Sequence, residues 1–520
     1  MFSSSSSSSL QWMSLIGTIW LQTANGGNTD FPVYSSELKD LKKISQVGIN
    51  FLAFASDAGK LFGWFSGVAA AYLPLWLVAA VGAAFVLVGY GLQFLLLDKP
   101  YFAYAHILLL TALAGNGICW INTACYLICI KNFASSADTR IAVGLSTSYV
   151  GLSAKIYTAL ASAVFDKKRK HTAKQYLLLN SLVPVLVAVV VSPFLRPIPS
   201  RRITRPSRGF IAMFAITSAT GVCAVIGTID GSASSRGKLL MIILGLLLAS
   251  PLVIPLAVRF REAMAEVTRN KKENRVHDLM VADDVEAGGD GDVEVDKLDD
   301  VVEDSQSEDV GGLQMLKKVA FWLYFFSYLF SATLGMVFLN NLGQIAESRG
   351  LRVDETSTLV SLSSSFGFFG RLLPFLLDYY SSKKKCMISR AASMATLMAP
   401  MAGSFFLLLD GRRLSLYMST AIVGAFTGAI TSIAVSATRE LFGTKHFSVN
   451  HNIVITNIPI GSIVFGYLAA LVYQRGVQQG SAPKCIGNGC YQKTFVVWAI
   501  TCSFGSLLCT LLYLRTRRKQ

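Results

Sequence analysis

Charged residues are scarce in this chain of 520 residues, where they make up 15% of the sequence against 52% for hydrophobic residues. Together with a mean hydropathy of +0.50, this composition excludes an ordinary soluble globular protein. The acidic residues are concentrated: fourteen lie between Val276 and Val310, with Lys297 as the one basic residue among them. Dense like charge with little hydrophobicity cannot offset the entropy of ordering, so we predict a disordered loop there.

The sequence also lacks the usual signatures of catalysis and of ATP use. It contains no GxxxxGK[ST] loop, no HExxH motif and no nucleophile elbow, and its five histidines have no metal-ligand spacing. We therefore predict that the protein is not an enzyme, has no metal and no cofactor, and uses a gradient. The net charge of +16 resides in loops rather than in a basic soluble domain. This distribution fits contact with anionic lipid headgroups and argues against nucleic-acid binding.

Long apolar runs recur along the chain, each near the ~20 residues that a helix needs to cross a bilayer. They predict an all-α polytopic membrane protein with fourteen transmembrane helices, at 12–34, 47–71, 75–97, 102–127, 141–165, 176–195, 210–229, 239–258, 319–345, 356–380, 387–409, 415–438, 451–473 and 494–514.

These helices fall into two sets of six with an extra pair between them. The predicted plan is a disordered tail (1–11), an N-terminal six-helix bundle (12–195), the extra helix pair (210–258), an acidic disordered cytoplasmic loop (259–318), a C-terminal six-helix bundle (319–514) and a basic tail (515–520). An even number of crossings puts both termini on one side. The distribution of basic residues favours the cytoplasm for that side, in the plasma membrane or an endomembrane.

Ionisable residues inside the predicted helices are candidates for function, because burying one in a membrane costs roughly 3 kcal/mol. Asp57 and Lys60 are three residues apart and face each other on the second helix. They form either an ion pair that stabilises the fold or a site that binds solute or relays a proton. Lys155, in the fifth helix, faces a solute cavity, pairs with a distant acid such as Asp57, or snorkels. Two lysines favour an anionic solute.

Polar residues elsewhere give weaker signals. Asn116, Asn340, Asn341 and Gln344 either hydrogen-bond between helices or contact the solute. Arg371 and Asp378 precede a run of lysines and form either a latch between the bundles or an interfacial anchor. Cys485 and Cys490 lie in a polar loop, where a disulfide is favoured over a zinc site because no second pair of ligands accompanies them.

Several motifs together resemble the plant nodulin-like branch of the major facilitator superfamily, the group that contains nuclear-fusion-defective-type proteins. In the first half these are YSSELK from Tyr34, KNF from Lys131 and VGLSAKIYT from Val150. In the second half they are NNLGQIAES, GRLLP, RELFGTKHF and CIGNGCYQKTF, beginning at Asn340, Gly370, Arg439 and Cys485. The resemblance implies a multi-pass carrier of small molecules with a major-facilitator-like fold.

Two functional hypotheses follow. The first is a secondary active transporter that moves a small solute, either anionic or uncharged and polar, by alternating access, with a proton as one candidate coupling ion. The second is a receptor or sensor that keeps a carrier fold and signals through the acidic loop. A membrane-embedded enzyme is the least favoured reading.

Deleting residues 276–310 separates the two hypotheses. A carrier whose loop is a spacer keeps its solute flux after the deletion, because the loop contributes no binding group. Flux per folded molecule, measured in proteoliposomes, should stay within about twofold of the wild type. Loss of a cellular output with flux unchanged would instead favour the sensor.

Overall fold

The computed structural model describes residues 6–133, 136–165, 172–198, 206–229, 234–264, 267–268, 309–383, 389–479 and 485–517. All regular elements within these ranges are helices. Most of the predicted acidic loop, including its acidic run up to Glu308, lies outside the described residues. Helix α1 begins at Ser6, inside the predicted tail, and α21 continues to Arg517, inside the predicted basic tail. Arginine is a good helix former, which accounts for the extension of α21.

The N-terminal bundle, up to Phe194, contains two segments that are each built from more than one helix, at α1–α2 and at α3–η1–α4. Its elements are α1 (Ser6–Ala24), α2 (Phe31–Lys42), α3 (Gln46–Ala58), η1 (Gly59–Phe62), α4 (Trp64–Tyr72), α5 (Leu75–Leu96), α6 (Tyr104–Asn132), α7 (Ser136–Val164), α8 (Thr172–Val191) and η2 (Ser192–Phe194).

The C-terminal bundle repeats this plan, with its first and fifth segments also divided. It comprises α12 (Gly312–Leu316), α13 (Val319–Tyr328), η4 (Leu329–Thr333), α14 (Leu334–Asn340), α15 (Leu342–Ser348), α16 (Val353–Lys383), α17 (Arg390–Leu407), α18 (Arg413–Phe442), α19 (Phe447–Ile455), α20 (Asn457–Gln479), η5 (Asn488–Cys490) and α21 (Gln492–Arg517).

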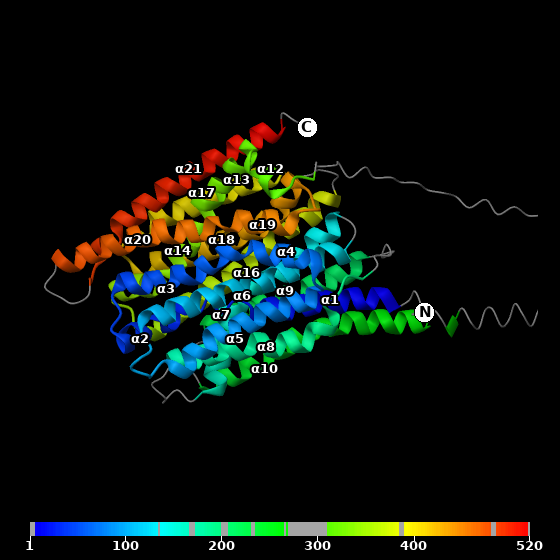
Figure 1. Cartoon of the computed structure of the whole chain (residues 1–520), viewed down its shortest axis with the longest axis horizontal. Helices are drawn as coiled ribbons and strands as arrows, with labels where there is room; N and C mark the ends of the chain where they lie inside the picture. The colour runs from blue at the N-terminus through cyan, green and yellow to red at the C-terminus, as the bar shows by residue number, and fades with distance from the viewer. Residues whose placement is uncertain are drawn as a thin grey trace, which may run out of the picture.

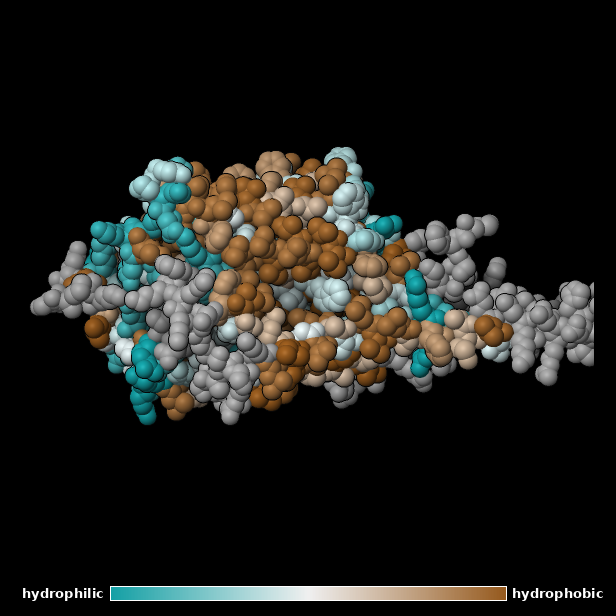
Figure 2. All heavy atoms as spheres, turned by 90° about the horizontal axis from the view of Figure 1, so that it is seen from below, coloured by the Kyte–Doolittle hydropathy of each residue, from teal (hydrophilic) through white to brown (hydrophobic). Residues whose placement is uncertain are grey.

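The helices run roughly along the long axis of the molecule, and both chain termini lie at the same end (Figure 1). We call this the terminal end, and the end that carries α2 the far end. A wide hydrophobic belt covers the middle of the visible surface, with hydrophilic residues at both ends (Figure 2). Among the described residues, nine helices are long and apolar enough to cross a membrane. The predicted total of fourteen crossings stays a prediction.

The extra pair, α9 (Pro206–Ile229) and α10 (Ser234–Ala249) followed by η3 (Ser250–Leu252), packs against the bundles from one side. Helix α9 contacts both α7 of the N-terminal bundle and α16 of the C-terminal bundle. It is hydrogen-bonded to α7, where the Tyr149 hydroxyl lies 3.2 Å from the Thr217 hydroxyl. Toward α16 its contact is apolar, because Gly221 faces the rings of Phe368 and Phe369.

The two bundles meet along two seams, one between α7 and α16 and the other between α3–α4 and α19–α20. Hydrogen bonds cross between the bundles on both sides of the centre. At the far end, Asn50 Nδ2 donates to Asn341 Oδ1 at 2.9 Å. Toward the terminal end, the Ser448 hydroxyl donates to the Gly67 carbonyl at 3.3 Å. The space between the bundles is therefore bounded at both ends.

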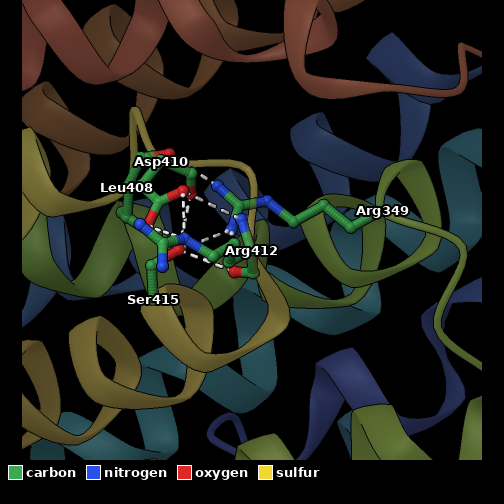
Figure 3. Close-up of polar contacts among 5 residues, drawn as sticks. All are labelled: Arg349, Leu408, Asp410, Arg412 and Ser415. Atoms are coloured by element: carbon green, nitrogen blue, oxygen red, sulfur yellow. Dashed lines mark hydrogen bonds and ion pairs between the residues drawn. The ribbon is translucent and has the colours of Figure 1, made fainter.

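One arginine holds the far end of the C-terminal bundle together. Arg349, which follows α15, points into the turn between α17 and α18 (Figure 3). Its Nη2 donates to the Leu408 carbonyl at 2.6 Å, and its Nη1 to the Arg412 carbonyl at 3.3 Å and to Ser415 Oγ at 3.4 Å. Burial lowers the pKa of Arg349, while the neighbouring Asp410 acts to raise it. The cation meets the carbonyl end of α17, where positive charge is stabilised.

Substituting Arg349→Met should destabilise this end of the bundle by about 2 kcal/mol, because hydrogen bonds to a charged donor are lost and carbonyls lose their partner. The thermal midpoint of the purified protein in detergent, followed by light scattering or fluorescence, should fall by several degrees. Arg412→Met is the matched control, since its pair with Asp410 at 2.9 Å is formed by a side chain that is 83% exposed. Equal shifts for both variants would contradict this assignment.

Candidate functional site

The first membrane segment is interrupted halfway, which the predicted continuous helix at 12–34 did not anticipate. Helix α1 ends at Ala24, α2 begins at Phe31, and the sequence between them is Asn-Gly-Gly-Asn-Thr-Asp. Two consecutive glycines carry a high entropic cost in a helix, and Asn, Thr and Asp are weak helix formers. The predicted continuous helix was therefore wrong, because these weak helix formers end α1 although the residues around them are hydrophobic.

The backbone groups freed by this interruption are bound by neighbouring helices. The Ser153 hydroxyl of α7 donates to the Thr23 carbonyl at 2.7 Å, and the Tyr157 hydroxyl donates to the Ala24 carbonyl at 2.7 Å. Asn180 of α8 donates to the Gly27 carbonyl at 3.1 Å. Such replacements are required inside a membrane, because no bulk water is present to satisfy the backbone.

Three further interruptions occur: a 3₁₀ turn at η1 follows α3, the π-helical η4 lies between α13 and α14, and α19 gives way to α20 at Thr456. The break after Ala24 and the one at η4 both lie in the first segment of their half. Interrupted helices in corresponding places of two halves are typical of the solute site in secondary transporters. All four interruptions contribute residues to, or border, the same cavity.

That cavity, of about 200 Å³, lies between the two bundles. Both bundles supply polar walls, and the residues used below are Asn25, Asn28, Thr29, Asp57, Lys60, Asn122, Tyr126, Tyr328, Asn340, Arg371, His451 and Asn452. The apolar lining includes Ile118, Met336, Leu339 and Ile458. A mostly apolar cavity with a few polar groups is the usual form of a small-molecule site.

Asp57 and Lys60 form an ion pair on the cavity wall. Lys60 Nζ lies 2.6 Å from Asp57 Oδ1, and both side chains are nearly buried. Asp57 lies in the last turn of α3 and Lys60 in η1. The 3₁₀ turn has three residues per turn, so it places Lys60 directly beside the Asp57 carboxylate. The other carboxylate oxygen accepts a hydrogen bond from Ser462 of α20. The pair therefore contributes no net charge to the cavity and also joins the two bundles.

Arg371 brings a second cation to the cavity from the C-terminal bundle. Arg371 lies near the middle of α16, which extends from Val353 to Lys383, and it lines the cavity. Its guanidinium approaches α7 at Gly151, where an added Cβ would lie 2.7 Å from Nη1. It also interacts with the phenol groups of Tyr126 and Tyr328. Within the described part of the chain, it has no hydrogen bond and no carboxylate partner.

Amide and hydroxyl groups complete the polar walls. Asn25 Nδ2 donates to Asn122 Oδ1 at 3.0 Å, which fixes the interrupted segment against α6. Asn452 of α19 donates to the Thr123 hydroxyl of α6 at 3.0 Å. His451 Nδ1 lies 3.2 Å from the Thr438 hydroxyl. These bonds hold the cavity side chains in place before any solute arrives.

Lys155 does not reach the cavity. Its Nζ donates to the Gly227 carbonyl of α9 at 3.0 Å. Since Gly227 lies in the last turn of α9, the lysine meets unsatisfied carbonyl groups at a negative helix end. The partner of Lys155 is thus a carbonyl group of the extra helix pair, where the sequence predicted an acidic residue or a solute. The packing of that pair cannot be inferred from the sequence.

The predicted amide residues separate into two groups. Asn340 lines the cavity, whereas Asn341 accepts a hydrogen bond from Asn50, and Gln344 Nε2 donates to the Ser35 hydroxyl at 3.4 Å, so both lie at the far-end contact between bundles. Asn116 lies where α6 packs closely on α3, next to Gly59. The Asp378 side chain lies outside the described residues, and Cys485 and Cys490 form a disulfide at the far end.

Substitutions of the ion pair should distinguish its structural contribution from a role in transport. Asp57→Asn or Lys60→Met alone leaves one buried ionic group without its partner, which costs about 3–5 kcal/mol. The double variant should recover most of the lost thermal stability in detergent, because both charges are then absent. If the double variant is as unstable as the sum of the single variants, the pair does not act as a unit.

Comparisons with known proteins agree with this geometry. Residues 11–258 match the family described as Nodulin-like, and residues 303–520 match the family described as NFD4, C-terminal domain. A relative from Arabidopsis thaliana, Protein NUCLEAR FUSION DEFECTIVE 4, is 36% identical over 542 residues, covering 98% of this chain and 89% of that protein.

Solved transporters share the fold at low sequence identity. The proton:xylose symporter XylE of the major facilitator superfamily, bound to 6-bromo-6-deoxy-D-glucose, aligns with a TM-score of 0.56 at 11% identity over 96% of this chain and 95% of its own. A structure of proton-dependent oligopeptide transporters aligns at 0.51 and 13% identity, covering 99% and 100% of the two chains. The chain is an integral membrane protein with the major facilitator fold and belongs to the nodulin-like family.

Proposed function

We propose that this protein is a secondary active transporter of a small organic anion, with a carboxylate group as the recognised feature, rather than an enzyme or a sensor. The central observation is the charge in the cavity. Asp57 and Lys60 neutralise each other, and Arg371 then remains as a cation with no carboxylate partner in the described part of the chain. A buried cation inside a membrane needs an anionic partner, which a passing solute can provide.

The chemistry of Arg371 favours a carboxylate. A guanidinium has a planar set of N–H donors that matches the two oxygens of a carboxylate in a bidentate arrangement. The hydroxyl groups of Tyr126 and Tyr328 lie in the same part of the cavity and can donate to an oxyanion. The amide groups of Asn25, Asn28 and Asn340 can contact uncharged polar parts of the solute. The small cavity volume supports a small solute.

The way in which the bundles are joined supports alternating access. Hydrogen bonds connect them on both sides of the cavity, as at Asn50 and Ser448, and also at the cavity wall, where Ser462 donates to Asp57 and Asn452 to Thr123. Opening one end breaks the bonds at that end, while those at the other end are kept. Arg371 comes from one bundle and the Asp57–Lys60 pair from the other, so a solute that contacts both stabilises the closed arrangement.

A proton gradient is the energy source that we propose. The two solved transporters named above are described as proton-coupled or proton-dependent, and the family assignment places this chain on the same fold. Uptake of an anion together with a proton also reduces the cost of moving its charge against a membrane potential that is negative inside.

The test is uptake by the purified protein in proteoliposomes, using radiolabelled mono- and dicarboxylates, inorganic phosphate and sulfate, with xylose as a neutral solute. We expect saturable uptake of at least one carboxylate. Arg371→Gln should reduce that uptake about 10- to 100-fold, since a hydrogen bond to a charged group contributes about 1.5–3 kcal/mol. Arg371→Lys should retain part of it because the charge is kept.

Lys155→Met is the matched control, since it removes a buried cation that lies outside the cavity. If the charge inside the cavity determines solute affinity, this substitution should leave that affinity unchanged. Transport of xylose with no carboxylate uptake, or unchanged carboxylate uptake in Arg371→Gln, would contradict the proposal. Elution profiles in detergent must match the wild type for each variant used.

A further inference from the structure

Two buried carboxylates lie in the N-terminal bundle near the cavity, and their surroundings differ. Asp57 is bound by Lys60 and Ser462, as described above. Asp30, at the end of the interrupted first segment, is fully buried and accepts hydrogen bonds from Asn180 Nδ2, which lies 3.1 Å from each carboxylate oxygen. Asn180 is neutral. Within the described residues, no lysine, arginine or histidine contacts Asp30.

The position of Asp30 in the chain makes its side-chain direction informative. It is the N-cap residue of α2, where an aspartate usually accepts a hydrogen bond from the backbone of the following turn. Here its side chain makes no such capping bond and is turned instead toward Asn180 of α8. Helix capping, the usual reason for an aspartate at an N-cap position, therefore does not explain Asp30.

The titratable groups that interact electrostatically with Asp30 come from four helices. They are the phenols of Tyr34 on α2, Tyr90 on α5, Tyr157 on α7 and Tyr176 on α8. All four are neutral in the ordinary pH range and none can compensate a negative charge as a cation would. A carboxylate in such surroundings costs several kcal/mol in its ionised form, and taking up a proton removes that cost.

A small second cavity links two of these tyrosines, Tyr34 and Tyr90, to the solute site. Its volume is about 20 Å³, and its walls include Tyr34, Tyr90 and Ser56. Three other wall residues, Asn28, Asp57 and Asn340, also line the central cavity. This volume is enough for about one water molecule in polar surroundings. Asp30 lines neither cavity, so the hydroxyl groups of Tyr34 and Tyr90 and this water molecule are the groups that would carry a proton between it and the solute cavity.

We propose that Asp30 is the group that binds and releases the coupled proton, at a site behind the solute cavity rather than within it. This inference rests on the proposed transport function. The mechanical link is the interrupted segment, because Asn25, Asn28 and Thr29 line the solute cavity and Asp30 follows directly. Asn180 binds both the Gly27 carbonyl and Asp30, so a change of charge on Asp30 alters a bond that positions the cavity wall.

The predicted coupling cycle is simple. The carboxylate of Asp30 takes a proton from the side of higher proton concentration, and the neutral acid allows the bundles to move with solute bound. The proton then leaves Asp30 to the other side, and the anionic form returns. No other bond is made or broken, and the proton is the one charged species that crosses with the solute.

The first test is infrared spectroscopy of the purified wild-type protein and of Asp30→Asn, recorded across a pH series in lipid. The C=O stretch of protonated carboxylic acids should contain a component that titrates in the wild type and is missing in Asp30→Asn. Asp98→Asn is the matched control, since it changes an exposed carboxylate paired with Lys174 at the far end. That variant should keep the component, and its loss there as well would overturn the assignment.

The second test uses proteoliposomes and the carboxylate identified in the uptake screen. With an imposed proton gradient, the wild type should accumulate the solute above its external concentration. Asp30→Asn should exchange labelled for unlabelled solute across the membrane and fail to accumulate it. Accumulation by Asp30→Asn at the wild-type level would overturn the inference.

Asn180→Ala is the second variant, for use also if Asp30→Asn is poorly folded. It removes the amide donor that stabilises the ionised carboxylate, so the acid should stay protonated and accumulation should fall while the infrared component persists. Unaltered accumulation together with an unaltered infrared titration would overturn the inference. If no carboxylate is transported, the proposed function fails, and the infrared arm still decides whether Asp30 titrates.

Discussion

The whole arrangement depends on one constraint of the bilayer: a backbone group or an ionic side chain that leaves a regular helix must find its partner inside the protein. The interrupted first segment meets this constraint through Ser153, Tyr157 and Asn180, which bind the carbonyl groups that the break exposes. The same requirement fixes Lys60 on Asp57 and Lys155 on the end of α9. Polar groups are therefore confined to a few places, and the largest of these is the cavity between the bundles.

Much of the fold could be predicted from sequence, because hydrophobic runs report membrane segments directly. The all-helical major facilitator fold and the family resemblance carried by motifs such as GRLLP were confirmed. The breaks were harder to predict, since a hydropathy pattern averages over the Gly26–Gly27 pair. The weak helix formers around Gly26 and Gly27, which lie between two apolar stretches, were nevertheless an indication of the first break.

The site was predicted in part. Asp57 and Lys60 were recognisable because their spacing on a helix makes them neighbours. The role of Lys155 could not be read from its own helix, since its partner is a carbonyl on α9, more than 70 positions away in the chain. Arg371 was noted, but whether it faces the cavity or the interface depends on how α16 packs against α7, which the sequence of α16 alone does not show. Asp30, Tyr126, Tyr328 and His451 were missed because single polar residues near apolar runs carry no spacing signal.

The attachment of α9 has a consequence for motion. Its hydrogen bonds reach α7 at Thr217 and Gly227, whereas toward α16 it presents Gly221 to two phenylalanine rings. Directional bonds resist displacement, and an apolar surface opposite a glycine does not. In the transport cycle proposed above, we therefore expect the extra pair to stay attached to the N-terminal bundle while its Gly221 surface slides over Phe368 and Phe369. The pair would then span the seam between α7 and α16 in both arrangements of the bundles.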